Sequence, residues 1–440
     1  MAKVNVRNRN AGKYDKSGRL KPAAWEYRFQ SAPVDGKRKW ISKGGFATKK
    51  EAQIEGAKKL AEYESAGLKY EPSNMSYADY LDYWFDNYVK MHCKYNTQLA
   101  YNRVIEGHLK PALGMYKLSS LTPIMLQEYV NQKFTTGLKK TTLTNIMSVM
   151  TGSLKYAVVP AKLLHSSPAE YIKYPKVTAD RAEKNRTVIS IEDFNRMLER
   201  FPKGNPFRYA LLIGFHTGLR IGETFALTWD DICLDEGTLE VNKLAYKRNY
   251  GVDVRQVMKD KGKREEKSAW YFGDTKTRSS VRKIKIGSTL VQELREWRRM
   301  QMEWQLQYGE YYTLIYKKEE KDEKGNTIHR LIEVEKSVPV SLQKANVIMR
   351  RENGQYVSTD SFKYAARIIH YELGIGTFNY HSLRHTHATY LISNGVSPKA
   401  VQARLGHENI ETTLQTYVHN TEAMEQSAVD VFEKILESKA

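Results

Sequence analysis

The pattern of apolar and polar positions predicts a small β-sheet near the start of the chain. Residues 24–47 alternate apolar and polar side chains in two runs, and Asp35 and Gly36 between them favour a tight turn. Residues 48–67 are rich in strong helix formers and end at Gly67. We therefore expect one helix to pack across the sheet.

From residue 76 to about residue 171 the pattern becomes helical. Apolar residues recur three and four positions apart in YADYLDYWFDNYV and LTNIMSVMTGSLKYAVV, as the core of a helical bundle requires. The methionine and aromatic stripes are interpreted as core positions. Four helices are expected, with breaks at Pro111, Gly114, Thr122–Pro123 and Gly137.

A polar, basic linker precedes a third part that mixes helices with a β segment between about residues 230 and 287. Two charged stretches, 244–272 and 305–345, are interpreted as elaborations without chemistry of their own, and the second contains a hairpin-like turn, DEKGNT. These patterns predict a multidomain fold that is mainly α with small β-sheets. The expected segments are 1–67, 75–175, 185–420 and a C-terminal tail helix over 421–440.

Charge adds a polyanionic partner to this picture. The 440-residue chain holds 70 Lys and Arg against 50 Asp and Glu, a formal net charge of +20. The first 70 residues hold 17 basic and 7 acidic side chains, so they carry +10 of that excess. Charge alone fits either nucleic acid or an anionic membrane surface.

Neither a membrane span nor a secretion signal is expected. No apolar run approaches the ~18 residues that a spanning helix needs, and the N-terminus lacks the hydrophobic stretch of a signal peptide. We therefore expect the chain to act in the cytoplasm, in the bacterial cytosol or associated with the nucleoid, without a membrane partner. Cys93 and Cys233 form no CxxC pair, so we interpret both as ordinary part-buried thiols.

The segment HTGLRIGETFALTWDDI predicts an anion site. Gly218 ends one helix and Arg220 opens the next, which places a guanidinium beside the outward-pointing N–H groups of a helix start. Arg220 could equally pair with Glu223, which lies three residues further on.

The segment HSLRHTHATYLISNG places two polar groups on one helix face. His381 and Arg384 stand three residues apart, so they can converge on one ligand. His385 and His387 resemble a metal-binding pair, but residues two apart on a helix point in different directions. We therefore expect them to pack rather than to bind a metal.

A third segment, SPKAVQARLGHENIETTLQTYVHN, has clear helix punctuation. Ser397 is the expected N-cap, Gly406 the expected C-terminal stop, and His407 follows in a tight turn. Tyr417 lies ten residues later on a predicted short helix. Taken alone, such a tyrosine is more often a half-buried core residue than a reactive one.

Read in order, these segments resemble the tyrosine recombinase, or phage-type integrase, family. HTGLRIGE, HSLRHTHAT and LGHENIETTLQTYVH match the active-site boxes of that family without a missing member. The resemblance implies an N-terminal arm-binding β-sheet with a helix and a helical core-binding domain. It also implies a mixed α/β catalytic domain of the DNA breaking-rejoining type.

The resemblance also implies roles for individual residues. Tyr417 would be the nucleophile that forms a 3′-phosphotyrosine bond, and Glu223 would support the first arginine. Lys276 would be a general acid on a β-hairpin. The implied catalytic set is Arg220, Lys276, His381, Arg384, His407 and Tyr417, and the close rivals of Lys276 are Arg278, Arg282, Lys283 and Lys285.

The chemistry of phosphodiester cleavage is compatible with these roles. Two planar guanidiniums can neutralise the non-bridging oxygens of the scissile phosphate in place of a metal ion. A tyrosine hydroxyl with a pKa near 10 needs help to become phenolate, and His381 is the expected helper. Because a phosphotyrosine bond keeps the energy of the broken diester, neither ATP nor any cofactor is expected.

The implied partners are double-stranded DNA with core and arm attachment sites, a homo-tetramer on that DNA, a host DNA-bending protein and an excision factor. The tail could dock on its own domain or on a neighbouring protomer. The basic N-terminal surface could be merely solvated, but its aromatic residues favour DNA binding. The candidate DNA-binding residues are Lys37, Arg38, Lys39, Trp40, Lys94, Lys139 and Lys140.

The expected function is site-specific recombination that integrates and excises a phage or conjugative element by stepwise strand exchange. A type IB topoisomerase would use a similar arginine, histidine and tyrosine set. A cellular recombinase that resolves chromosome dimers would lack the arm-binding part. A DNA-binding regulator without catalysis is the alternative from another class, although no expected catalytic residue is missing.

Overall fold

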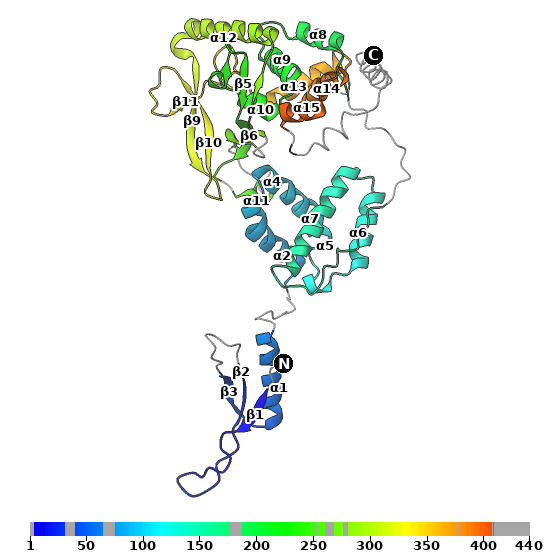
Figure 1. Cartoon of the computed structure of the whole chain (residues 1–440), viewed down its shortest axis with the longest axis vertical. Coiled ribbons are helices and arrows are strands. Elements are labelled where there is room, and N and C mark those ends of the chain that lie inside the picture. The colour runs from blue at the N-terminus through cyan, green and yellow to red at the C-terminus, as the bar shows by residue number, and fades with distance from the viewer. Residues whose placement is uncertain are drawn as a thin grey trace, which may run out of the picture. The chain divides into compact units, whose positions relative to one another are not determined.

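A computed structural model of the chain describes residues 4–30, 40–64, 75–175, 187–251, 253–259, 268–275, 280–376, 378–406 and 408 (Figure 1). The chain divides into two compact units, Met1–Val177 and Thr178–Ala440. Among the described residues, no helix combines the length and the apolar character that crossing a lipid bilayer demands.

The first unit begins with a three-stranded antiparallel sheet of β1 (Asn5–Asn8), β2 (Trp25–Gln30) and β3 (Trp40–Phe46). Helix α1 (Lys49–Glu64) packs across it, as predicted. The two predicted strands are also confirmed, as β2 and β3. Strand β1 was not predicted, because it is short and has no fully buried residue that would give a periodic signal.

The rest of this unit contains four helical rods, in agreement with the prediction. The first rod joins α2 (Tyr77–Trp84), η1 (Phe85–Val89) and α3 (Lys90–His92); the second joins α4 (Tyr95–Val104), η2 (Ile105–Leu109) and α5 (Lys110–Leu113); α6 (Pro123–Thr135) and α7 (Lys140–Val158) follow. Thr122 caps α6 through the Met125 N–H.

The predicted break at Pro111 is wrong, because this residue lies inside α5. A proline has no N–H to donate, and inside a regular α-helix its ring clashes with the preceding turn. Here the π turn η2 comes just before it, and the Lys110 N–H donates to the Ile105 carbonyl five residues back. The wider turn lets the rod continue as far as Leu113.

The second unit is built mainly from helices. They are α8 (Ile191–Arg200), α9 (Pro206–Thr217), α10 (Ile221–Ala226), η4 (Trp229–Asp231), α11 (Val254–Lys259), α12 (Ser288–Tyr308), η6 (Gly309–Tyr311), α13 (Thr359–Tyr371), α14 (Tyr380–Ser393) and α15 (Pro398–Leu405). A small sheet has the order β4 (Ile232–Cys233), β5 (Thr238–Val241), β8 (Arg282–Lys285).

The two charged stretches that were interpreted as separate elaborations form one five-stranded sheet. Its order is β11 (Gln343–Lys344), β9 (Thr313–Lys321), β10 (Thr327–Glu335), β7 (Ser268–Asp274), β6 (Lys243–Asn249). The predicted hairpin turn is confirmed, since Asp322 Oδ1 accepts the Lys324 and Asn326 N–H groups between β9 and β10. Figure 1 shows β9 and β10 extending away from α13, α14 and α15.

Helices α9 and α14 pack together through the core of this unit. The buried Tyr380 hydroxyl lies 2.9 Å from the Ala210 carbonyl oxygen and 2.8 Å from Thr224 Oγ1. Helix α14 also holds the start of the unit. The Ile189 N–H donates to Thr386 Oγ1 at 2.8 Å, and the Tyr390 hydroxyl donates to the Ile189 carbonyl at 3.0 Å.

The turn between α9 and α10 depends on Gly218, which has a φ of +67°. A Cβ atom there would lie 2.6 Å from Leu405 Cδ2 and 3.0 Å from His387 Cδ2. Gly395 also has a positive φ, +81°, but a Cβ atom there would meet nothing within 4 Å. Comparing alanine substitutions at the two glycines therefore separates the cost of left-handed backbone strain from the cost of a steric clash.

We expect Gly218→Ala to lower the free energy of unfolding by about 3 kcal/mol, from left-handed strain plus the clash. The matched variant Gly395→Ala should lose only about 1 kcal/mol, because it adds strain alone. Urea unfolding followed by circular dichroism would measure both values. Equal losses for the two variants would contradict the tight packing around Gly218.

Candidate active site

Three segments that are distant in the sequence meet at the end of α9. They are the α9–α10 turn with Arg220, the start of β8 with Arg282, and the C-terminal end of α15 with Leu405 and Gly406. Helix α14 lies beneath them and contributes Arg384. The contacts described below connect these segments.

Arg220 is the N-cap residue of α10 and has an extended backbone, as the glycine-terminated helix before it predicted. Glu223 Oε2 accepts the Arg220 backbone N–H at 3.0 Å, and Glu223 Oε1 accepts an Nη1 hydrogen at 2.8 Å. The pairing alternative is thus confirmed. The Arg220 side chain is nevertheless 39% exposed, so it is not enclosed by the protein.

Glu223 is buried between two guanidiniums. Its side chain is 4% exposed, Arg282 Nη2 lies 3.0 Å from Glu223 Oε2, and Arg282 Nη1 lies 3.5 Å from Oε1, the oxygen that Arg220 Nη1 also contacts. Burial alone would raise the pKa of this carboxyl group, but Arg282 and Arg220 lower the pKa below its usual value. The carboxylate is therefore ionised at neutral pH and holds both arginines.

Arg384 is fully buried, and its guanidinium joins two of the segments. Nη1 donates to the Gly218 carbonyl at 2.9 Å, and Nη2 donates to the Leu405 carbonyl at 2.8 Å. Arg220 Nη2 reaches the next carbonyl, that of Gly406, at 3.5 Å. Arg384 thus contacts Leu405 and Arg220 contacts Gly406, the two residues that precede His407.

His381 lies one turn before Arg384 on α14, as predicted. The side chain of His381 is exposed, whereas that of Arg384 is buried. The rings of His381 and His385 meet edge to face with centroids 4.5 Å apart. His381 is therefore placed at the surface above the buried guanidinium.

His387 packs against protein groups through both ring nitrogens. Nδ1 lies 2.9 Å from the Phe215 carbonyl, and Nε2 accepts a hydrogen bond from Arg404 Nε at 2.9 Å. Arg404 also donates to the carbonyls of Lys285 and His216. Within the described part of the chain, no group of three or more potential metal-ligating side chains is present.

The burial of His387 has a consequence for stability. Burial, followed by the charge of Arg404, lowers the pKa of His387 from 6.5 to about 4. Below pH 6.5 the unfolded state therefore binds more protons than the folded state, so the free energy of unfolding decreases as the pH falls. At about 1.4 kcal/mol per pH unit, we expect a loss of about 2 kcal/mol between pH 6.5 and pH 5.

Urea unfolding of wild type and His387→Gln at several pH values between 5 and 7 would test this effect. The variant should show a much smaller dependence on pH, because glutamine does not titrate. His216, whose pKa is also lowered by burial, should leave a smaller slope of the same sign. Identical slopes in the two proteins would contradict the lowered pKa of His387.

Several predicted site residues lie outside the described residues: Lys276, Arg278, His407, Tyr417, Lys37, Arg38 and Lys39. The three described rivals of Lys276 are all engaged. Arg282 is held by Glu223, Lys283 pairs with Glu236 at 3.2 Å, and Lys285 Nζ lies 3.4 Å from the Glu236 carbonyl.

The other predicted DNA-binding residues lie at element ends. Trp40 begins β3, is 48% exposed and lies under the Arg28 guanidinium at 4.6 Å. Lys94 and Lys139 are the N-cap residues of α4 and α7, and Lys140 is the first residue of α7.

Sequence reasoning did not predict the connecting roles of Arg282 and Arg404. A signal for Arg282 was available, because it stands two residues before Ile284 and four before Ile286, both buried. Alternate residues of a strand point to one face, so Arg282 shares the apolar face of β8. For Arg404 no comparable local signal exists.

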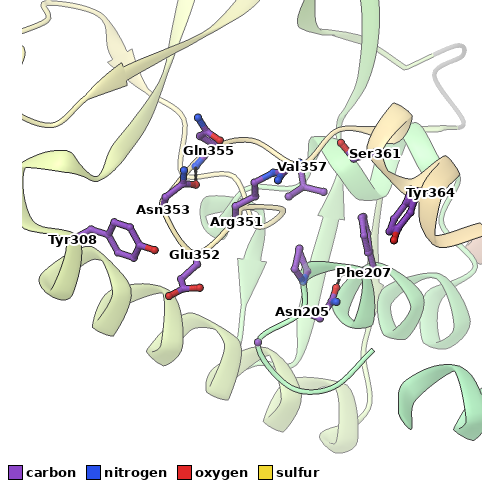
Figure 2. Close-up of a pocket in the computed structure, with 12 residues that line it drawn as sticks. Asn205, Phe207, Tyr308, Arg351, Glu352, Asn353, Gln355, Val357, Ser361 and Tyr364 are labelled. Carbon is purple, nitrogen blue, oxygen red and sulfur yellow. Dashed lines mark hydrogen bonds between the residues drawn. The ribbon is translucent and has the colours of Figure 1, made fainter. Parts of the chain in front are cut away.

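An open pocket of about 840 Å³ lies at the other end of α9 (Figure 2). Figure 2 shows Asn205 and Phe207 from the start of α9, Tyr308 from the end of α12, Arg351 from the loop before α13 and Tyr364 from α13. It contains none of the predicted catalytic residues. The catalytic assignments therefore rest on the arginine cluster and not on this cavity.

Comparison with known proteins decides the family. Residues 187–424, more than half of the chain, match the model of the phage integrase family. The chain belongs to the phage integrase family. It is a tyrosine recombinase, an enzyme that breaks and rejoins DNA, and its function is site-specific integration and excision.

The N-terminal parts of the recombinase also match family models. Residues 76–134 match the phage integrase N-terminal SAM-like domain, and residues 11–62 match an arm DNA-binding domain. The predicted fold class is thereby confirmed, with its arm-binding sheet and helix, its helical part and its mixed α/β catalytic part.

Known relatives of this recombinase span most of its length. A XerC-like tyrosine recombinase of Caldanaerobacter subterraneus subsp. tengcongensis is 27% identical, covering 87% of this chain and 89% of the relative. The ICEBs1 integrase of Bacillus subtilis is 22% identical and covers 76% of each. A solved structure of the Tn1549 transposon integrase shares the fold, with a TM-score of 0.58, 19% identity and coverage of 81% of this chain and 99% of that one.

Proposed function

We propose that Tyr417 attacks the scissile phosphate while Arg220 and Arg384 hold its non-bridging oxygens. The observation that supports this assignment most strongly is the convergence of both guanidiniums on the Leu405 and Gly406 carbonyls, immediately before His407. Three motifs that are about 20 to 190 residues apart thus form one cationic site. Such a site can neutralise a phosphodiester without a metal ion.

The remaining catalytic roles are proposed from the family boxes and from the neighbouring contacts. His381 is exposed on α14 and would assist the tyrosine, and His407 would complete the phosphate pocket. Lys276 would protonate the leaving 5′ oxygen. Arg282 is unsuited to that step because a guanidinium keeps its proton, and Lys283 and Lys285 contact Glu236 instead.

The experiment that tests this function is covalent capture. Purified protein would be incubated with nicked duplexes tiled from the DNA that flanks its gene, and denaturing gels would detect any adduct. Peptide mapping should then show that the DNA is attached through its 3′ phosphate to Tyr417. Tight binding without an adduct on any duplex would favour the regulator, and relaxation of supercoiled DNA without paired sites would favour the topoisomerase.

We also propose that the chain acts as four segments, 1–67, 75–175, 185–420 and 421–440. The first would bind arm sites, the second core sites, and the last would dock on a neighbouring protomer within a tetramer. The Tn1549 integrase, which shares the fold, is bound to transposon right-end DNA and to circular intermediate DNA in its solved structures. A host DNA-bending protein, an excision factor and a bacterial cytosolic location complete the proposal.

Arm-site binding should depend steeply on salt, because lysine and arginine contacts to phosphates release counterions. With about four such contacts, raising the salt from 50 to 200 mM should weaken binding of arm-site DNA about a hundredfold. Fluorescence anisotropy would measure how steeply the logarithm of the binding constant falls with the logarithm of the salt concentration. Lys39→Gln should reduce this slope by about one, the share of a single phosphate contact. Lys203→Gln, which removes a lysine paired with Glu296 in the other unit, should leave the slope unchanged.

A further inference from the structure

Arg282 touches two of the three converging segments and has no place among the proposed catalytic roles. Its side chain is only 7% exposed at the start of β8. Nη2 lies 3.0 Å from Glu223 Oε2, and Nε donates to the Arg404 carbonyl at 2.7 Å. Nη1 donates to the Ser280 carbonyl at 2.9 Å. The whole guanidinium is thus engaged by the protein.

Two of the three partners of Arg282, Glu223 and the Arg404 carbonyl, are linked to the proposed phosphate ligands. Glu223 holds the backbone and the Nη1 atom of Arg220. The Arg404 carbonyl is followed by the Leu405 carbonyl, which accepts from Arg384, and by the Gly406 carbonyl, which Arg220 reaches. One side chain therefore connects the support of Arg220 to the segment that both arginines contact.

The geometry requires an arginine at this position. A guanidinium presents a planar set of N–H donors, so it can pair with a carboxylate and donate to backbone carbonyls at the same time. A lysine ammonium is a single point on a flexible stem and cannot span these partners. A buried carboxylate that lost its partner would be strongly destabilised as a charge.

We propose that Arg282 is a positioning residue that holds Glu223 against Arg220 and fixes the end of α15, so that the phosphate site exists before DNA binds. This inference rests on the proposed function, in which Arg220 and Arg384 bind the scissile phosphate. Arg282 itself touches no reacting atom. Its loss should therefore slow cleavage without weakening the binding of DNA.

The matched control is Arg248, in strand β6 of the same unit. It is 8% exposed and forms an ion pair with Glu323 in the turn between β9 and β10. Arg248→Gln thus removes a paired arginine whose side chain is 10% exposed, close to the 7% of Arg282, although Glu323 is more exposed than Glu223. Any effect that Arg282→Gln shares with Arg248→Gln reflects stability alone.

Single-turnover cleavage of a nicked duplex, with protein in excess over DNA, would measure the positioning effect. We expect Arg282→Gln to slow adduct formation at least about thirtyfold, as loss of one aligned transition-state contact does. The dissociation constant for the duplex should change less than about threefold. Arg248→Gln should cleave within about twofold of wild type, and Arg282→Lys should recover only a small part of the loss.

A pH profile provides a readout that a purely structural role would not change. The charged and titratable groups facing Glu223 are Arg220 from α10, Arg282 from β8 and Tyr380 from α14. Without Arg282, burial should raise the pKa of Glu223, so cleavage by Arg282→Gln should fall as the pH is lowered from 8 to 6. Wild type and Arg248→Gln should not show this additional decrease of the cleavage rate between pH 8 and pH 6.

A double variant tests whether Arg282 acts through Glu223. The combination of Arg282→Gln with Glu223→Gln should cleave no more slowly than Glu223→Gln alone, because both changes remove the same support. The inference would be overturned if the double variant lost cleavage by the product of the two single losses. It would also be overturned if Arg282→Gln cleaved as fast as Arg248→Gln. If Arg282→Gln did not fold, Arg282→Lys would serve in its place for the rate and pH measurements.

The proposed function can fail independently of this inference. If wild-type protein forms no adduct at Tyr417 on any duplex, the proposed function fails. If wild type forms the adduct and Arg282→Gln forms it equally fast, with an unchanged pH profile, only the positioning role fails.

Discussion

Replacing Tyr417 with phenylalanine is expected to abolish covalent adduct formation while leaving DNA binding intact. The substitution removes one hydroxyl group, which is the proposed nucleophile, and keeps the ring. Without that oxygen the proposed phosphotyrosine bond cannot form, so adduct formation should fall at least about a thousandfold. Denaturing gels and gel shifts on one nicked duplex would measure the two properties together.

Tyr371→Phe is the matched control for this prediction. Tyr371 ends α13 in the same unit and is 78% exposed, so loss of its hydroxyl should change neither property. Adduct formation by Tyr417→Phe at the wild-type rate would disprove the assignment of the nucleophile. Loss of DNA binding in that variant would instead show that Tyr417 acts in the fold or in DNA recognition.

Arg220→Ala and Arg384→Ala should both lose cleavage, but the second should lose more stability. Arg220 is 39% exposed and shares the buried Glu223 with Arg282, so its removal should slow cleavage about a hundred- to a thousandfold and lower the free energy of unfolding by about 1 kcal/mol. Arg384 is fully buried on two carbonyls. Its removal should cost about 3 kcal/mol in addition to the loss of cleavage.

Single-turnover cleavage and urea unfolding of the two variants would separate these effects. Arg295→Ala serves as the control, because Arg295 is 55% exposed and pairs with Asp235 at the surface; it should change neither quantity. A stable Arg384→Ala protein would show that the Gly218 and Leu405 carbonyls find other donors. Normal cleavage by Arg220→Ala would remove this residue from the phosphate site.

Local signals predicted those parts of the fold that are decided locally. Gly218 and Gly406 adopt left-handed conformations at helix ends, and Ser397 caps α15 through the Ala400 N–H, all as the sequence indicated. The apolar periodicity predicted the four helical rods, and the run of strong helix formers predicted the helix across the first sheet. Such features depend on residues only a few positions apart, so a single sequence contains the information.

Features that depend on distant pairs were not predictable in this way. The five-stranded sheet requires β10 to pair with β7, where Arg330 opposes Tyr271, and no local pattern specifies that partner. The break predicted at Pro111 was wrong because the π turn η2 precedes it, and the local sequence does not show this turn. Among site residues, the family boxes predicted Arg220 and Arg384, but a motif does not show that Arg282 connects them.

The contacts of Ile189 determine when the catalytic unit can first become complete during synthesis. This residue stands at the start of the unit, yet its N–H and carbonyl are both bound by α14, about 200 residues later. Translation emits the chain from its N-terminus, so α14 must leave the ribosome before these contacts can form. A chain whose synthesis stops before α14 therefore lacks Arg384 and a closed catalytic unit. Incomplete products of this gene should consequently bind DNA without being able to cut it.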